Sequence, residues 1–149
     1  MRSYEPHQSL EQQALELERL NLPGARLTRV QGKELRYCFE ISPSEYSPLY
    51  KCLLIVPRNP KSPQMYVIKP DLVVRAEGKR PPHIYGYEEG KTRLCLWWPK
   101  QREWQRGMEF IETYIAWTTE WLWHYEYWRS TGEWAGGGAH PNPRDQKVG

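Results

Sequence analysis

Residues 27–56 read LTRVQGKELRYCFEISPSEYSPLYKCLLIV, and this stretch decides the fold class. From Leu35 to Ile41, apolar and polar side chains alternate, which is typical of a strand with one buried and one solvent-facing side. A turn at Gly32-Lys33 precedes this strand, and residues 27–30 form its partner in a predicted hairpin. Residues 50–56 are more continuously apolar, which favours an inner strand.

The residues on either side of this stretch extend the prediction. Ser9 and Gln12 form a capping box, and apolar residues at helical spacing follow, so we expect a helix over residues 9–21. After three prolines, residues 65–68 and 72–74 offer a last strand that Pro70 interrupts. The sequence therefore predicts an α+β fold with an N-terminal helix and a four-stranded antiparallel meander.

The C-terminal part of the chain has a different composition. Residues 75–103 are rich in glycine and proline around a short apolar island at 94–98, which predicts a long, functional loop that bears Cys95. A second helix is expected over residues 104–128, with Met108, Ile111, Ile115 and Leu122 facing the core. We expect residues 1–135 to form one domain and residues 136–149, rich in glycine and proline, to form a flexible tail.

Composition excludes several classes of protein. The 149 residues include 21 Lys and Arg against 18 Asp and Glu, and a net charge of +3 is too mild for a nucleic-acid-binding footprint. The longest apolar runs have five residues, so no membrane span is expected. The three cysteines have no metal-type spacing, and the N-terminus has no secretory signal. We therefore expect free thiols in a cytoplasmic protein, with no metal or organic cofactor.

Four features, in this order, resemble the catalytic domain of ubiquitin-conjugating enzymes. Residues 50–57 and the proline turn at 59–67 resemble that family's strand and its Tyr-Pro…Pro-Pro-x-Val turn. His83-Ile84-Tyr85 stands where the family carries His-Pro-Asn, and Leu94-Cys95-Leu96 resembles the sequence around its active cysteine. Trp104 resembles the tryptophan that follows that cysteine. The resemblance covers about residues 9–128.

Within that family, the chain is more similar to the bacterial branch found in cyclic-oligonucleotide-based antiphage signalling (CBASS). The His-x-Tyr and Cys-Leu-x-x-Pro patterns carry this similarity, together with the tryptophan-rich stretch 121–134. The resemblance implies a thioester between Cys95 and the C-terminal carboxylate of a cyclic-nucleotide synthase, a cGAS-like nucleotidyltransferase. The acyl group would then pass to an amine, and this transfer would prime signal synthesis.

The candidate catalytic residues are Cys95, His83 and Tyr85, and each has a structural alternative. A thiol beside Lys91 and Arg93 suits thioester exchange, which needs an accessible thiolate with a pKa near 8.5 or modestly lower. The alternative for Cys95 is packing between apolar neighbours. His83 either braces the loop or acts as a base. Tyr85 replaces the family's asparagine, so it is either the donor to the oxyanion or a surface aromatic residue.

Other cysteines and histidines have simpler interpretations. Cys38 and Cys52 occupy strand positions where a cysteine is usually a packing residue. His124, in the middle of the predicted helix, is expected to be packed or half-exposed. His140 offers a minor hypothesis, in which the tail folds back and the imidazole serves Cys95.

The sequence has 8 Trp and 10 Tyr but 2 Phe, an excess of aromatic side chains that carry a polar group. Trp117, Trp121 and Trp128 at helical spacing are typical of a core stripe. A second interpretation of the aromatic excess is a partner-binding surface, to which we assign Trp97, Trp98, Trp121, Trp128 and Trp134. The alternative function is therefore a non-catalytic binding module on the same fold. A nucleic-acid-binding accessory protein is a third possibility, against which the acidic residues near the basic ones argue.

Overall fold

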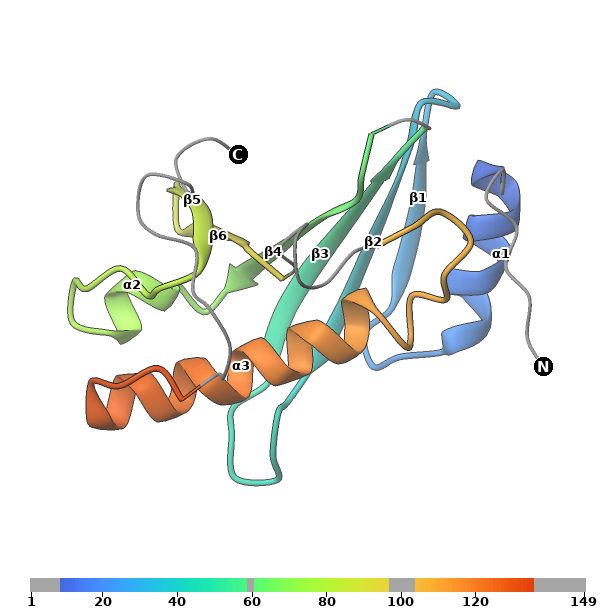
Figure 1. The fold of residues 1–149 in the computed structure, drawn as a ribbon. Helices are drawn as coiled ribbons and strands as arrows, with labels where there is room; N and C mark the ends of the chain where they lie inside the picture. Colours follow the sequence, from blue (N-terminus) through green and yellow to red (C-terminus); the bar gives the residue numbers. More distant parts are fainter. Residues whose placement is uncertain (1–8, 59–60, 97–103, 136–149) are drawn as a thin grey trace.

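A computed structural model describes residues 9–58, 61–96 and 104–135. Six strands form one antiparallel sheet in the order β1-β2-β3-β4-β6-β5. In Figure 1, α3 runs across one face of this sheet and α1 lies beside β1. The elements are α1 (Leu10–Leu20), β1 (Arg26–Val30), β2 (Glu34–Ile41), β3 (Tyr50–Pro57), β4 (Gln64–Lys69), α2 (Leu72–Arg75), β5 (Ile84–Glu88), β6 (Lys91–Leu94) and α3 (Tyr114–Thr131).

The first helix and the first four strands confirm the sequence-based expectation. The Ser9 hydroxyl accepts a hydrogen bond from the Gln12 backbone N–H, and the Gln12 side chain accepts one from the Ser9 N–H. The helix ends at Asn21, whose left-handed backbone has a φ of 51°. Side chains of β2 alternate between buried and more exposed positions as predicted. Those of β3, expected to be more continuously apolar, alternate in the same way, so that one set of each strand enters the core. Those fully or almost fully buried are Leu35, Tyr37, Phe39, Tyr50, Cys52, Leu54 and Val56.

The prediction of a four-stranded sheet is wrong, because residues 84–94 add a hairpin of two further strands. Glu89 and Gly90 have φ values of 51° and 79°, the left-handed conformations that a tight two-residue turn requires. The sequence signal for this hairpin is weak, because its strands have five and four residues and include charged side chains. Residues 75–103 are therefore not one irregular loop.

Residues 72–74, expected to form a strand, belong to the short helix α2. The Asp71 carboxylate accepts hydrogen bonds from the backbone N–H groups of Val73 and Val74, both at 3.0 Å. An aspartate at this position satisfies N–H groups that have no partner within a helix. The N-cap therefore outweighs the preference of valine for strands.

The last helix begins at Tyr114 rather than at residue 104. The segment before this helix is held by polar contacts to α1, to the end of β3 and to the loop that follows β3. Arg106 donates to the Gln13 side chain at 2.8 Å and to the carbonyl oxygens of Pro57 and Lys61. Ile115 and Leu122 are buried as predicted, whereas Ile111 is 39% exposed and does not face the core.

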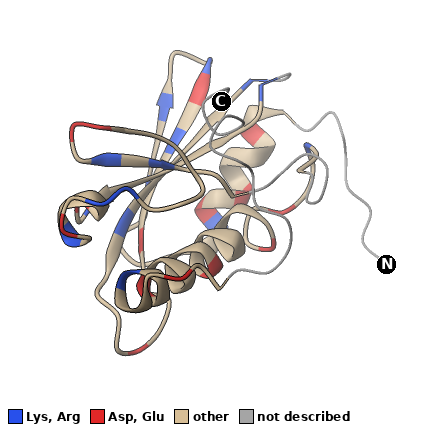
Figure 2. Ribbon diagram, turned by 60° about the vertical axis from the view of Figure 1, so that its left-hand side comes forward, with Lys and Arg blue, Asp and Glu red and all other residues tan. Residues whose placement is uncertain are grey.

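Charged side chains are spread over many elements of the described chain. Figure 2 shows Lys and Arg on strands and near helix ends, with Asp and Glu interspersed among them. This distribution agrees with the small net charge of +3. Among the described residues, no helix has the length and apolar character needed to cross a membrane.

Glu16 makes the fold sensitive to pH. Its carboxyl accepts a hydrogen bond from the Phe110 N–H at 2.5 Å. Burial, followed by the negative charges of Glu109 and Glu112, raises the pKa of Glu16 to about 7, although the Phe110 N–H opposes this shift. A carboxyl whose pKa is higher in the folded protein stabilises it fully below its usual pKa of 4.5, and the contribution is lost as the pH rises to about 7.

We therefore expect Glu16→Gln to remove a fall in stability between pH 5 and pH 8. The amide keeps an acceptor for the Phe110 N–H but carries no charge. At pH 8 the variant should be more stable than the parent by roughly 1–2 kcal/mol, a figure discounted for partial solvent screening. Urea unfolding at several pH values measures this difference. Glu45→Gln, on an exposed loop, is the control, and an unchanged pH slope in Glu16→Gln would contradict the account.

Candidate functional site

Cys95 lies directly after β6, which ends at Leu94. Its backbone N–H donates to the His83 carbonyl at 3.0 Å, which continues the pairing of β5 with β6. His83 has a φ of 56°, a left-handed conformation that is uncommon for a residue other than glycine. Two of the three predicted catalytic residues are therefore joined through their backbones.

Tyr85 reaches the Cys95 thiol because of an irregularity in β5. Ile84 pairs with Leu94 and Gly86 pairs with Arg93, so Tyr85 is an extra residue between two paired positions. Such a bulge redirects the side chain of the extra residue. The Tyr85 hydroxyl is hydrogen-bonded to the Cys95 thiol. The Arg93 guanidinium lies over the Tyr85 ring, 4.9 Å from its centroid.

The environment of the Cys95 thiol has opposing effects on its acidity. Burial raises the pKa of Cys95 above its usual value, while the Tyr85 hydrogen bond and the positive charge of Arg93 partly offset the rise. The residue is 9% exposed. The structure thus differs from the expectation of an accessible thiol with an ordinary or lowered pKa. In the free protein this thiol is mostly protonated at neutral pH.

The other two cysteines occupy the strand positions expected for packing. Cys52 is fully buried, and burial raises the pKa of its thiol strongly. Cys38 is partly buried on β2. Cys38, Cys52 and Cys95, all in the described part of the chain, form no disulfide. Within residues 9–58, 61–96 and 104–135, no three His, Cys, Asp or Glu side chains gather in a way that could hold a metal ion.

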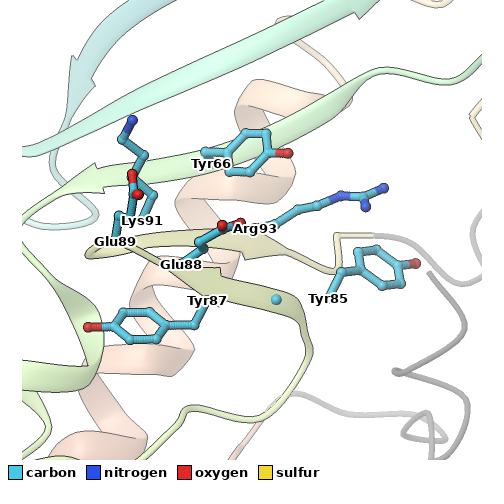
Figure 3. Close-up of a pocket in the computed structure, with 8 residues that line it drawn as sticks. Tyr66, Tyr85, Tyr87, Glu88, Glu89, Lys91 and Arg93 are labelled. Carbon is cyan, nitrogen blue, oxygen red and sulfur yellow. The ribbon is translucent and has the colours of Figure 1, made fainter.

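An open cavity of about 510 Å³ runs along the hairpin from Tyr85. Figure 3 shows Tyr85 and Arg93 near one end, Tyr66 of β4 above Arg93, and the acidic residues at the hairpin turn. Because phenol hydroxyls and charges of both signs line it, this cavity is polar rather than hydrophobic. Its lining residues are Tyr66, Tyr85, Gly86, Tyr87, Glu88, Glu89, Lys91 and Arg93.

Two of the tryptophans assigned to partner binding support His83 instead of forming a free surface. Trp121 is 4% exposed, and its indole N–H donates to the His83 carbonyl at 3.0 Å. The Trp134 ring lies 5.2 Å from the His83 ring and 5.3 Å from the Trp121 ring, between centroids. Trp128 is partly buried against Tyr125. Trp97, Trp98 and His140 lie outside the described residues, as does the expected tail.

The most exposed aromatic pair on α3 was not among the residues predicted to bind a partner. Trp123 and Tyr127 are 48% and 38% exposed, and their rings stack with centroids 5.8 Å apart. Their i, i+4 spacing was the available signal. His124, between them in sequence, is packed as expected, with its ring 5.6 Å from Trp134 and its Nε2 3.8 Å from a Glu120 oxygen.

The family of this chain follows from comparison with known proteins. The model of the Type II CBASS E2 protein family matches residues 13–141, and the chain belongs to this family. No curated protein matches the sequence significantly. Membership places the protein among the E2-like components of CBASS antiphage systems, with a protein partner in such a system. This family membership is consistent with the observed mixed α/β fold, which has an antiparallel sheet, an N-terminal helix and a C-terminal helix.

Tyr85→Phe tests the hydrogen bond at the thiol. Because the hydroxyl lowers the pKa of Cys95, we expect its removal to raise that pKa further, so that iodoacetamide labelling of Cys95 needs a more alkaline pH. Mass spectrometry of the Cys95 peptide over a pH series measures the shift. Tyr46→Phe, at a residue that is 91% exposed, should leave the profile unchanged. A Tyr85→Phe profile that is unshifted or displaced to lower pH contradicts the contact.

Proposed function

We propose that this protein carries an acyl group as a thioester on Cys95 and passes it to an amine. The single observation that supports this proposal most directly is the hydrogen bond of the Cys95 thiol to Tyr85, a residue that lines a polar cavity. Family membership supplies the context of E2-like chemistry in CBASS. The acyl donor would be the C-terminal glycine of a cGAS-like nucleotidyltransferase, and the protein would act in the cytoplasm.

Loading would require an activated carboxyl group, such as a thioester or an acyl adenylate. The Cys95 thiolate attacks the carbonyl carbon and forms a C–S bond, and the leaving group departs with its electron pair. The proton of the thiol goes to solvent. In the second step an amine attacks the same carbon, a C–N bond forms, and Cys95 leaves as the thiolate while the amine loses its proton to solvent.

Tyr85 and Arg93 are the side chains that fit the needs of both steps. The Tyr85 hydroxyl donates toward sulfur, so it stabilises the thiolate that attacks in the first step and leaves in the second. The same donor is near enough to the reacting centre to serve the tetrahedral oxyanion, the role that asparagine has in ubiquitin-conjugating enzymes. Arg93 favours the same negative charges by its position over the Tyr85 ring.

The polar cavity offers a path for the peptide that precedes the reacting carbonyl. It extends from Tyr85, beside the thiol, toward the hairpin turn, and Tyr66 and Arg93 line its wall. Backbone amides of an extended peptide need donors and acceptors, which phenol, carboxylate and guanidinium groups provide. His83 serves this site as a brace, because its carbonyl accepts the Cys95 N–H.

A non-catalytic binding module is the second candidate function. The burial of Cys95 and its raised pKa favour it, because both reduce the reactivity of the thiol. The exposed Trp123–Tyr127 pair would supply binding area on α3. In this case Cys95 is a packing residue and Tyr85 fills the space beside it.

Substitution of Cys95 separates the two candidates. Coexpression with a cGAS-like nucleotidyltransferase of a CBASS system should give a covalent adduct that survives denaturation and is cleaved by a thiol. Cys95→Ser should convert it into an ester that resists thiols and is cleaved by hydroxylamine at high concentration, whereas Cys95→Ala should form none. Intact-mass spectrometry measures the outcome for the parent and for both variants.

Cys38→Ser is the matched control, since Cys38 is a partly buried cysteine on the same sheet. It should retain the thiol-labile adduct in full. An adduct that persists unchanged and thiol-labile in Cys95→Ser would exclude Cys95 as the carrier. The absence of any adduct in the parent, with a stable noncovalent complex, would support the binding module.

A further inference from the structure

Trp134 is a partly buried aromatic residue in an otherwise exposed segment. The helix α3 ends at Gly132, whose φ of 82° reverses the chain and whose N–H donates to the Trp128 carbonyl at 2.7 Å. The residues around Trp134, from 131 to 135, are exposed. This turn brings the indole back onto α3, where it contacts Trp121 and His124.

The same indole contacts His83, which belongs to the candidate site. The His83 carbonyl accepts two hydrogen bonds of 3.0 Å, one from the Cys95 N–H and one from the Trp121 indole N–H. Trp134 packs against both the His83 ring and the Trp121 ring. A short chain of contacts therefore links the end of α3 to the backbone of Cys95.

His83 needs such support because of its backbone conformation. A left-handed φ of 56° is unfavourable for a residue with a Cβ atom, and surrounding contacts must hold it in place. Release of His83 toward an ordinary conformation would move its carbonyl and withdraw the acceptor of the Cys95 N–H. Tyr85 belongs to β5 and Cys95 directly follows β6, and this hydrogen bond continues the pairing of the two strands.

We propose that Trp134 is a positioning residue for Cys95, acting through His83 and Trp121. The part of this proposal that concerns acyl transfer rests on the proposed function, whereas the effect on the thiol does not. Loss of the indole should loosen the site, and this has opposite consequences for two measurements. A small alkylating reagent reaches Cys95 more readily, while acyl transfer, which needs the aligned thiol, becomes slower.

The experiment compares Trp134→Ala with the parent and with three other variants. We expect Trp134→Ala to raise the rate of iodoacetamide labelling of Cys95 by about three- to tenfold, the range that corresponds to the loss of one or two aromatic contacts. Trp134→Phe should restore most of the parental rate. Trp121→Phe, which keeps a ring but removes the donor to His83, should raise the rate to a smaller extent. Tyr46→Ala, at an aromatic residue that is 91% exposed, should label as the parent does.

Thermal unfolding of each variant separates local loosening from global instability. Labelling is compared at a temperature at which all four variants are at least 95% folded by circular dichroism, with Cys52 as the internal reference for a fully buried thiol. Faster labelling of Cys95 alone in Trp134→Ala supports the proposal. Equal acceleration of Cys95 and Cys52, or no acceleration of either, overturns it.

Acyl transfer from a small glycyl thioester gives the second measurement. We expect Trp134→Ala to transfer about three- to tenfold more slowly than the parent, in the direction opposite to its labelling. Transfer at the parental rate overturns the positioning role. If the parent itself accepts no acyl group from any activated donor, the proposed function fails, and the labelling comparison still decides whether Trp134 holds Cys95 in place.

Discussion

The site depends on one backbone atom, the carbonyl oxygen of His83. This oxygen accepts the Cys95 N–H from the end of β6 and the Trp121 indole N–H from α3. One acceptor thus joins the hairpin that carries the thiol to the helix that covers the sheet. Because His83 adopts a left-handed conformation, this junction persists only while the aromatic side chains of α3 and Trp134 support it. Aromatic residues that could have served a partner surface contribute first to the order of the site.

The parts of the fold that the sequence predicts well are those governed by local rules. The capping box at Ser9 and Gln12 marks the start of α1, and the alternation from Leu35 to Ile41 marks a half-buried strand. The hairpin of β5 and β6 escaped prediction because its strands have five and four residues and its turn is Glu89-Gly90 rather than a more typical pair. Valines at 73 and 74 suggested a strand, but the Asp71 cap decides for a helix. Such outcomes depend on single tertiary or capping contacts that periodicity does not report.

In the candidate site, too, sequence patterns predicted which residues take part but not the environment that the fold gives them. The resemblance to ubiquitin-conjugating enzymes, carried by motifs in the same order along the chain, was enough to nominate Cys95, His83 and Tyr85, and the structure places all three around the start of β5 and the end of β6. It was not enough to predict the acidity of the thiol, since burial outweighs Tyr85 and Arg93 and raises the pKa. Helical spacing likewise grouped Trp121 with Trp128 but did not show that Trp121 is buried beneath Trp134 while Trp123 faces solvent. Burial and a bulge at one residue are properties of the folded chain as a whole.

Membership in the Type II CBASS E2 family gives these contacts a chemical setting, and the central structural claim is that Cys95 stands at an ordered junction. Hydrogen exchange at the Cys95 amide, followed by NMR, tests this claim most directly. The account predicts that this amide exchanges on the slow timescale of the paired amides in β6, because its proton is bonded to the His83 carbonyl. Exchange as fast as that of an exposed loop amide, such as that of Glu45, would contradict it.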